Sequence, residues 1–226
     1  MGSPEYAKIE AARERRDQLA AERKQQEVIK NRLAALWRLR GRRYSRCTLG
    51  NFRAATDAQR SARANVRHYI QRLPEMIQAG TGLLLYGPPG TGKDHLLAAV
   101  MRAAVEQGDT VTWCSGPELF ARLRDRMDTG EAEGGWIRLL TEPRTLAISD
   151  PVSPLGSLSK YEAGMLYAVI DQRYSKCKPT WVTLNAKGHA DASAKLTEAI
   201  LDRLKHDAVV VPCDWESFRK PLPKRK

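Results

Sequence analysis

The sequence predicts an α/β fold in which a parallel sheet of five strands lies between two layers of helices. Short apolar stretches typical of buried strands alternate with stretches of helical period along residues 56–211. A glycine-rich turn follows the first of these strands and leads into an apolar helix. Before this alternating region, residues 5–40 contain no Gly or Pro and are rich in Ala, Glu, Arg and Gln, which predicts one long helix.

The predicted elements follow from these patterns in chain order. Strands are expected at 81–86, 110–114, 145–149, 180–184 and 208–211. Helices are expected at 56–79, 94–107, 116–127, 136–140, 161–175 and 196–204. The first of these helices is expected to bend at Pro74, and residues 130–135 form a break between two others. In such a sheet, ligands bind at the carboxyl edge, where the strands end.

The turn between the first strand and its helix has the sequence GPPGTGK at residues 87–93. Its glycines permit a tight turn with backbone N–H groups aimed inward, and the following helix adds the positive end of its dipole. The Lys93 ammonium then reaches the β- and γ-phosphates of a nucleotide. A plain surface turn is the alternative, but both flanks that the motif needs are present. The candidate nucleotide-binding residues are Gly87, Pro88, Pro89, Gly90, Thr91, Gly92, Lys93, Asp94 and His95.

The net charge of +12 is concentrated at the two ends of the chain. Residues 1–46 contain 13 basic residues (Lys or Arg) and 6 acidic residues (Asp or Glu). Residues 219–226 contain 5 basic residues and 0 acidic residues, whereas residues 47–218 contain 20 of each kind. Basic ends of this kind favour contact with a phosphate backbone or an acidic protein. The alternative is a solvated helix and a solvated tail that charge keeps in solution.

The composition argues against several other classes of protein. No apolar run approaches the roughly 18 residues of a membrane span, and the N-terminus is too charged for a signal peptide. We therefore expect a soluble, cytoplasmic protein without a membrane partner. The four cysteines stand alone in the sequence, with no C-x-x-C pair and no nearby histidine cluster, which argues against a zinc site or a disulfide framework.

Five motifs, in their order along the chain, resemble one family. They are GPPGTGKDHLL at 87–97, Ser-Asp at 149–150, Thr-Leu-Asn at 183–185, ILDRL at 200–204 and DWESFR at 214–219. Over residues 44–219 the chain resembles the AAA+ ATPases of the DnaC/DnaI helicase loaders and the related IstB transposition ATPases. The resemblance implies a P-loop NTPase domain at 44–219 that binds ATP with Mg²⁺. Outside the resemblance, composition and charge lead us to expect a basic, partner-binding helix at 1–43 and a basic tail at 220–226.

The same resemblance implies roles for individual residues. Lys93 matches the lysine of the phosphate loop, and Asn185 matches the sensor that positions the attacking water near the γ-phosphate. Arg203 matches the arginine finger, which reaches the nucleotide of a neighbouring subunit and so implies a ring or spiral of several copies. The alternative for Arg203 is an exposed helix arginine paired with Asp202 or Asp207.

Two positions depart from the family pattern. Asp94 stands where Ser or Thr normally holds Mg²⁺, and Ser149-Asp150 stands where the family has a magnesium-holding Asp before an acidic residue. One hydroxyl and one carboxylate have thus changed places, and Asp94, Ser149 and Asp150 together still offer the oxygen ligands that Mg²⁺ prefers. Asp150 can also orient water as a base. The competing interpretation is a site that binds ATP, hydrolyses it poorly and acts as a switch.

The resulting expectation is a loader ATPase that self-assembles with ATP and helps place a hexameric replicative helicase on single-stranded DNA. In this interpretation the N-terminal helix binds the helicase. The stretch 118–140 contacts DNA through Arg122, Arg124, Arg126 and Arg138. Three of these arginines fall at every second residue and cannot share one helix face, so a solvated helix is the alternative. A transposition helper that binds duplex DNA and a transposase, and a nucleotide-gated adaptor with little hydrolysis, are the other candidate functions.

Overall fold

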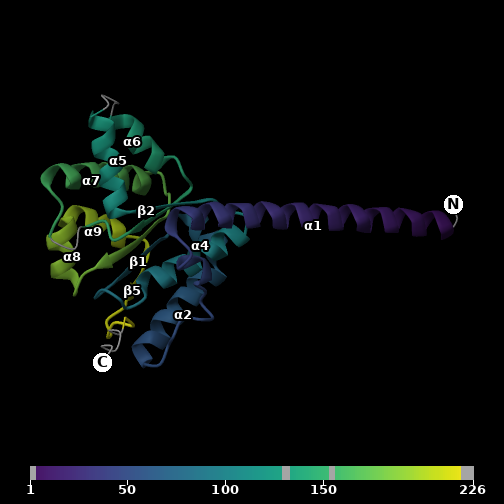
Figure 1. Ribbon diagram of the computed structural model, residues 1–226, viewed down its shortest axis with the longest axis horizontal. Helices are drawn as coiled ribbons and strands as arrows, with labels where there is room; N and C mark the ends of the chain where they lie inside the picture. The colour runs from purple at the N-terminus through teal and green to yellow at the C-terminus, as the bar shows by residue number, and fades with distance from the viewer. Residues whose placement is uncertain (1–3, 129–132, 153–155, 220–226) are drawn as a thin grey trace, which may run out of the picture.

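The computed structural model describes residues 4–128, 133–152 and 156–219. Its centre is a five-stranded sheet with the strand order β2-β3-β4-β1-β5 (Figure 1). The strands are β1 (Gly82–Gly87), β2 (Val111–Ser115), β3 (Thr145–Ser149), β4 (Thr180–Asn185) and β5 (Ala208–Pro212). All neighbouring strands are parallel, which confirms the predicted sheet. Each strand begins and ends within one residue of its expected bounds.

The strand order decides which strand ends become neighbours. β1 lies beside β4 with Gly87 opposite Asn185, and β3 lies on the other side of β4 with Ser149 opposite Thr183. Parallel strands all end at the same edge of a sheet. The glycine-rich turn after β1 therefore shares that edge with the residues that end β3 and β4.

Helices cover both faces of the sheet. They are α1 (Pro4–Arg40), α2 (Asp57–Gln71), α3 (Leu73–Ala79), α4 (Lys93–Glu106), α5 (Gly116–Asp128), α6 (Glu133–Thr141), α7 (Lys160–Ser175), α8 (His189–Leu196) and α9 (Glu198–Lys205). One hydrophobic cluster packs α2, α3, α4 and the end of α1 on one face, and a second packs α5 to α9 on the other. The side chains of β1 point alternately to the two faces of the sheet, so Leu83 and Leu85 belong to the first cluster and Leu84 belongs to the second. Within the described ranges, none of these helices is both long and apolar enough to cross a bilayer.

Two expected helices are each divided in the structure. The stretch 56–79 forms α2 and α3, which meet at Arg72, so the break precedes Pro74 and that proline lies in the first turn of α3. The stretch expected at 196–204 begins only at Glu198, because Thr197 has a φ of 81° and separates α9 from α8. Sequence patterns do not predict α8, whose residues HADASAKL carry few apolar side chains.

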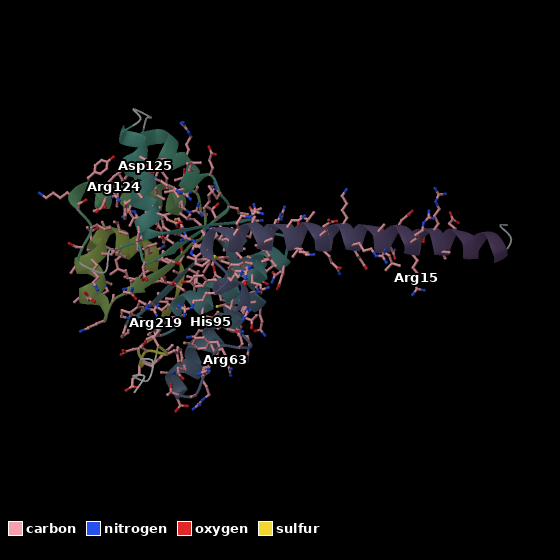
Figure 2. All side chains as sticks on the ribbon, viewed as in Figure 1. Arg15, Arg63, His95, Arg124, Asp125 and Arg219 are labelled. Atoms are coloured by element: carbon pink, nitrogen blue, oxygen red, sulfur yellow. The ribbon has the colours of Figure 1, made fainter. Side chains whose placement is uncertain are left out.

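The predicted long helix is confirmed as α1, which extends away from the body of the protein (Figure 1). Its side chains from 10 to 28 are exposed, and Arg15 points into solvent (Figure 2). Only the last turns pack on the domain, where Leu36 and Trp37 are buried and Ile29 and Leu33 lie against the same cluster. The apolar stripe therefore docks α1 on the domain, whereas most of the helix has no partner among the described residues.

A buried arginine links the helices of the second layer to the sheet. Arg173 of α7 is fully buried, and burial lowers the pKa of its guanidinium to about 10, so it remains charged at neutral pH. Its guanidinium donates hydrogen bonds to the hydroxyl of Thr180 and to the carbonyl oxygens of Leu140, Pro143, Arg144 and Pro179. These bonds satisfy a charge that is costly to bury, and they hold the segments that lead into β3 and β4.

Candidate functional site

The phosphate-loop motif lies between the end of β1 and the start of α4, as the sequence predicts. Gly87 has a φ of 151°, and a Cβ atom at this position would lie 2.3 Å from the carbonyl oxygen of Cys213. Gly90 has a φ of 83°, and its Cβ would lie 2.0 Å from the hydroxyl of Ser217. Side chains cannot fit at these two positions, so the residue types are required by the close approach of the chain that follows β5.

Lys93 connects the loop to the end of β4. Its ammonium donates hydrogen bonds to the carbonyl oxygens of Gly87 and Pro88, at 2.9 and 2.8 Å, and to Oδ1 of Asn185 at 2.7 Å. The side chain is buried, and burial lowers the pKa of the ammonium. Two residues that the sequence places 92 positions apart are thus in direct contact, and a cation lies inside the loop where a phosphate would be bound.

The two exchanged residues, Asp94 and Ser149, are each held by a neighbouring strand. The hydroxyl of Thr183 on β4 donates a 2.7 Å hydrogen bond to Oδ1 of Asp94. The indole N–H of Trp113 on β2 donates a 2.7 Å hydrogen bond to the hydroxyl oxygen of Ser149, and both side chains are buried. Asp94, Ser149 and Asp150 line one cavity of about 320 Å³ at the edge of the sheet. The three predicted metal ligands therefore lie around a common space.

The carboxyl of Asp150 has a raised pKa. It follows β3 with a φ of 45°, and its backbone N–H bonds the carbonyl oxygen of Thr183 at 2.9 Å. One carboxylate oxygen, Oδ1, is buried without a hydrogen-bond partner. Burial, and then the charge of Asp94, raise the pKa of Asp150 to about 6, against the opposing effects of Lys93 and Asn185. A carboxyl with this pKa can exchange a proton near neutral pH.

These residues fit Mg²⁺ only in part by themselves. Among the described residues, no group of three or more His, Cys, Asp or Glu is arranged to hold a metal ion alone. However, Asp94 and Asp150 offer carboxylate oxygens, Ser149 offers a hydroxyl oxygen, and one oxygen of Asp150 lacks a partner. Hard oxygen donors of this number suit a Mg²⁺ ion that takes its other ligands from phosphates and water.

The segment after β5 covers the phosphate loop. The indole N–H of Trp215 donates to the carbonyl oxygen of Thr91 at 3.0 Å, and the backbone N–H of Phe218 donates to the carbonyl oxygen of Gly90 at 2.9 Å. The ring of Phe52 lies edge-on to both aromatic rings. The motif DWESFR, which contributes to the family resemblance, is therefore a support of the loop backbone.

His95, expected among the nucleotide-binding residues, faces a different part of the chain. Its Nε2 lies 2.8 Å from the carbonyl oxygen of Thr48, and its ring packs edge-on to Phe52 at 5.5 Å between centroids. These contacts join α4 to the segment before α2. The structure thus brings Lys93, Asp94, Asp150 and Asn185 together but gives His95 a packing contact.

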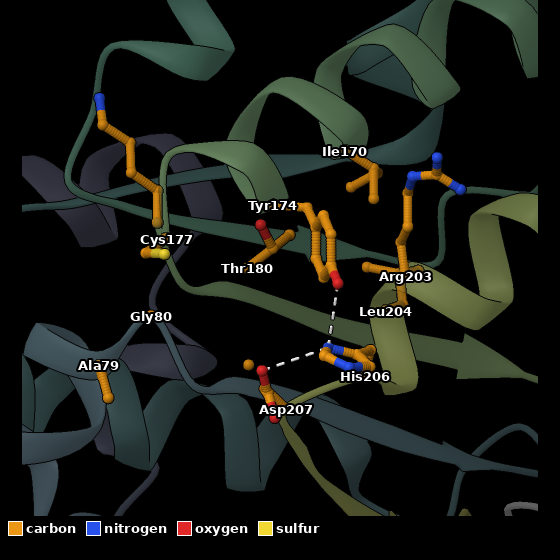
Figure 3. A pocket seen from close by; sticks show the side chains of 12 residues that line it. Ala79, Gly80, Ile170, Tyr174, Cys177, Thr180, Arg203, Leu204, His206 and Asp207 are labelled. Carbon is orange, nitrogen blue, oxygen red and sulfur yellow. Dashed lines mark hydrogen bonds and ion pairs between the residues drawn. The ribbon is translucent and has the colours of Figure 1, made fainter.

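Arg203 lies on α9, beside a cavity that is separate from the phosphate loop (Figure 3). Its Nε donates to Asp171 at 2.7 Å, and its Nη2 donates to the hydroxyl of Tyr167 at 2.7 Å. The guanidinium also stacks over the Tyr167 ring at 4.6 Å from the centroid. Its ion-pair partner is thus Asp171 on α7, and the pairing with Asp202 or Asp207 considered from the sequence was wrong, because α7 packs beside α9.

Arg122, Arg124 and Arg138, which are expected to contact DNA, are all exposed in the structure. Arg124 also lies 3.6 Å from the carboxylate of Glu162 (Figure 2 labels Arg124). The side chain of Arg126 and the basic tail at 220–226 lie outside the described residues.

Sequence patterns do not single out three residues that shape the site. Thr183 holds Asp94, and Trp113 holds Ser149. Arg40, at the end of α1, lines the same cavity as Asp94 and Ser149. A tryptophan or threonine in an apolar strand is typical of a core, and an arginine in a basic helix is typical of a surface. Their roles depend on the strand order and on how α1 packs against the domain, and local sequence patterns predict neither.

Asp150→Asn is expected to raise the free energy of unfolding above pH 6, because the amide removes a buried charge. The folded pKa of about 6 exceeds the ordinary 3.8, so the folded protein binds this proton more tightly and loses stability as pH rises between these values. The gain should be on the order of 1–3 kcal/mol at pH 7–8 and vanish near pH 4. Asn tolerates the positive φ.

Urea unfolding of wild type and variant from pH 4 to pH 8 measures this difference. The exposed Asp125→Asn is the matched control and should show no such pH-dependent gain. A stability difference between Asp150→Asn and wild type that stays constant with pH would contradict the assignment.

Comparison with known proteins identifies the family. The family model described as "IstB-like ATP binding protein" matches residues 43–225. The replicative helicase loader DnaC of Escherichia coli K12 is 25% identical over 178 residues, which cover 78% of this chain and 70% of that protein. An IS21 putative ATP-binding protein of Pseudomonas aeruginosa is 30% identical over 148 residues, covering 63% and 54%. The crystal structure of the DnaC helicase loader has the same fold, with a TM-score of 0.67 at 23% identity, covering 76% of this chain and 99% of that one. This chain is therefore a DnaC/IstB-like AAA+ protein and belongs to the IstB-like ATP-binding family.

Proposed function

We propose that this protein is an ATP-hydrolysing loader that helps place a hexameric replicative helicase on single-stranded DNA. The observation that carries the proposal is the meeting of Lys93, Asp150 and Asn185 at the ends of β1, β3 and β4. Lys93 binds the β- and γ-phosphates, Asp150 accepts a proton from the attacking water, and Asn185 orients that water. With a pKa of about 6, Asp150 is mostly ionised at neutral pH and able to act as a base. The similarity to DnaC supports this choice of partner.

Asp94, Ser149 and Asp150 are the residues that hold Mg²⁺ in this proposal. The ion would neutralise charge on the phosphate oxygens during transfer. Asp94 supplies the carboxylate that Ser149 lacks, and the hydrogen bonds from Thr183 and Trp113 hold the oxygen atoms in place. The exchange of hydroxyl and carboxylate across the site thus preserves the set of oxygen ligands.

Arg203 serves a neighbouring subunit as an arginine finger in this proposal. Its guanidinium lines a cavity to which none of the phosphate-loop residues 87–93 contributes, so in this proposal it acts at the nucleotide of another subunit. Asp171 and Tyr167 restrict its rotamers, and its side chain remains 26% exposed. A restricted, partly exposed arginine is suited to contact in trans. The protein then acts as a homo-oligomer that assembles with ATP.

The partner-binding regions of the proposal are the two ends of the chain and one stretch of the ATPase domain. Residues 1–43 bind the helicase, 44–219 form the ATPase domain, and the basic tail at 220–226 contacts single-stranded DNA together with the arginines near 118–140. The exposed surface of α1 from residue 10 to residue 28 supports helicase binding, because so long a polar helix has little contact with its own domain.

Two observations favour alternative functions. The matched family includes IS21 ATP-binding proteins, which favours a transposition helper that binds duplex DNA and a transposase. The Asp94 carboxylate adds negative charge beside the phosphates, which favours a nucleotide-gated adaptor with little hydrolysis.

Steady-state turnover of ATP with Mg²⁺, with and without single-stranded DNA, tests the proposal. We expect turnover that rises with DNA and falls at least about 100-fold in Lys93→Ala, because this ammonium neutralises developing phosphate charge. Tight ATP binding without turnover would favour the adaptor.

Capture of a hexameric helicase by the wild-type protein distinguishes the loader, whereas preference for duplex DNA and a transposase would favour the transposition helper.

The exchange of ligands is tested by Asp94→Thr, Ser149→Asp and the double variant. Each single change leaves the site with one carboxylate too few or too many, so turnover should fall about tenfold or more. The double variant restores the usual family pattern and should recover at least wild-type turnover. A double variant no better than the worse single variant would refute the exchange.

A mixing experiment tests the finger. Arg203→Ala retains its nucleotide site but lacks the finger, whereas Lys93→Ala retains the finger but lacks the lysine that binds phosphate. Each variant alone should be nearly inactive, and an equal mixture should recover about one quarter of wild-type turnover if subunits assemble at random. If both variants assemble but their mixture is inactive, Arg203 is not an arginine finger, and its role is limited to its contacts with Asp171 and Tyr167.

A further inference from the structure

The last turn of α1 places Arg40 in the same cavity as the candidate metal ligands. This cavity is lined by Asp94, Ser149 and Asp150 on one side and by Arg40 and Trp113 on the other. The Arg40 side chain is only 9% exposed. Among the described residues that line the cavity, Arg40 is the one cation. A positive charge from the partner-binding helix therefore lies beside the proposed reaction centre.

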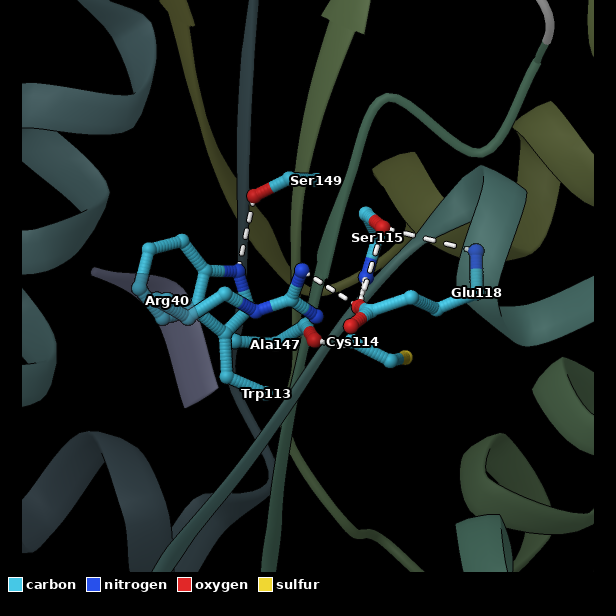
Figure 4. Close-up of polar contacts among 7 residues, drawn as sticks. All are labelled: Arg40, Trp113, Cys114, Ser115, Glu118, Ala147 and Ser149. Atoms are coloured by element: carbon cyan, nitrogen blue, oxygen red, sulfur yellow. Dashed lines mark hydrogen bonds and ion pairs between the residues drawn. The ribbon is translucent and has the colours of Figure 1, made fainter. Parts of the chain in front are cut away.

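Contacts with Glu118 and Trp113 fix the position of Arg40 (Figure 4). Its Nη1 lies 2.5 Å from a carboxylate oxygen of Glu118, and its guanidinium stacks over the Trp113 ring at 4.8 Å from the centroid. The same Glu118 oxygen accepts hydrogen bonds from the backbone N–H and the hydroxyl of Ser115. Trp113 in turn bonds the Ser149 hydroxyl, so one indole ring joins Arg40 to a candidate metal ligand.

The hydrogen bonds of Arg40 are nevertheless incomplete. Its Nε is buried and has no hydrogen-bond partner. A guanidinium carries five N–H donors arranged to match the oxygens of a carboxylate or a phosphate, and leaving a buried donor unpaired is costly. A structural arginine in this fold is satisfied differently, because Arg173 uses its donors on one hydroxyl and four carbonyl oxygens. The orphaned donor of Arg40 indicates a partner that the protein itself does not supply.

The charges around the cavity indicate the chemistry of that partner. Asp94 and Asp150 place two carboxylates at the edge where the phosphate groups of ATP are proposed to lie, and their mutual repulsion contributes to the raised pKa of Asp150. An anion can approach these carboxylates only with cations beside it. Lys93 provides one cation from the loop. Arg40 provides a second cation, in the cavity that Trp113 of β2 and Ser149 and Asp150 at the end of β3 also line.

We propose that Arg40 binds the terminal phosphate of ATP in its own subunit. This inference rests on the proposed function, because it takes ATP as the ligand. The free Nε of Arg40 donates to a γ-phosphate oxygen while Nη1 stays on Glu118. ADP lacks that phosphate, so Arg40 discriminates between the two nucleotides. Since Arg40 belongs to the last turn of α1, the contact also makes the docking of α1 dependent on the terminal phosphate.

The test is the affinity of full-length Arg40→Gln and Arg40→Lys for ATP and for ADP, measured by calorimetry with Mg²⁺. Arg40→Gln loses a charge-assisted hydrogen bond to phosphate, so its affinity for ATP should fall by about tenfold to 100-fold. Affinity for ADP should stay within about twofold of wild type, and Arg40→Lys, which keeps the charge but not the planar fork, should lie between. The exposed Arg38→Gln, on the same helix, is the matched control and should bind both nucleotides normally.

The outcomes separate this inference from the proposed function. Normal ADP binding shows that a variant is folded, so a loss confined to ATP supports Arg40 as the γ-phosphate ligand. If the variant loses affinity equally for both nucleotides, or for neither, the inference about Arg40 is overturned. ATP binding by the wild type would be unaffected by either result. If the wild type binds neither nucleotide, the proposed function itself fails.

Hydrogen exchange gives a second readout that does not depend on affinity. Saturating ATP should slow exchange of the backbone amides at 36–44 more than ADP does in the wild type, and this difference should disappear in Arg40→Gln. Equal protection by both nucleotides in the wild type would contradict the coupling to α1.

Discussion

The hydrogen bonds of the Lys93 ammonium are the interaction on which the rest of the site depends. They join two loop carbonyl oxygens to the side chain of Asn185, and so connect the turn after β1 to the end of β4. This contact is possible because β4 lies next to β1, with Gly87 opposite Asn185. The loop is held on its other side by the chain after β5, which bonds the carbonyl oxygens of Gly90 and Thr91. A loop fixed on both sides is preorganised for phosphate, because little freedom is lost on binding.

The same edge of the sheet concentrates charge in a small volume. Burial lowers the pKa of the Lys93 ammonium and raises that of the Asp150 carboxyl, and the negative charge of Asp94 raises the pKa of Asp150 further. Thr183 and Trp113 hold two of the oxygen donors with neutral hydrogen bonds, which orient these oxygens without adding charge. In the proposed metal site, β4 holds the Asp94 carboxylate through Thr183 and β2 holds the Ser149 hydroxyl through Trp113.

The long helix α1 has two parts with different physical roles. Its exposed part carries charged side chains on all sides, whereas its last turns bury Leu36 and Trp37 against the domain. The boundary between these parts lies close to the cavity, because Trp37 packs edge-on to Trp113, the ring that also carries Arg40 and bonds Ser149. The geometry thus gives a short path between α1 and the proposed metal site.

The class of fold, the bounds of the five strands to within one residue and the position of the phosphate loop can be predicted from the amino-acid sequence. These features follow from local causes: apolar runs that must be buried, glycines where no side chain fits, and a helix without glycine or proline. The family resemblance correctly indicated DnaC/IstB-like proteins. Three features could be found only in the folded protein: Asp171 holds Arg203, α8 precedes α9, and Arg40 shares a cavity with Asp150. Each of these depends on strand order or on how helices pack, because contacts between residues distant in sequence leave no periodic signal along the chain.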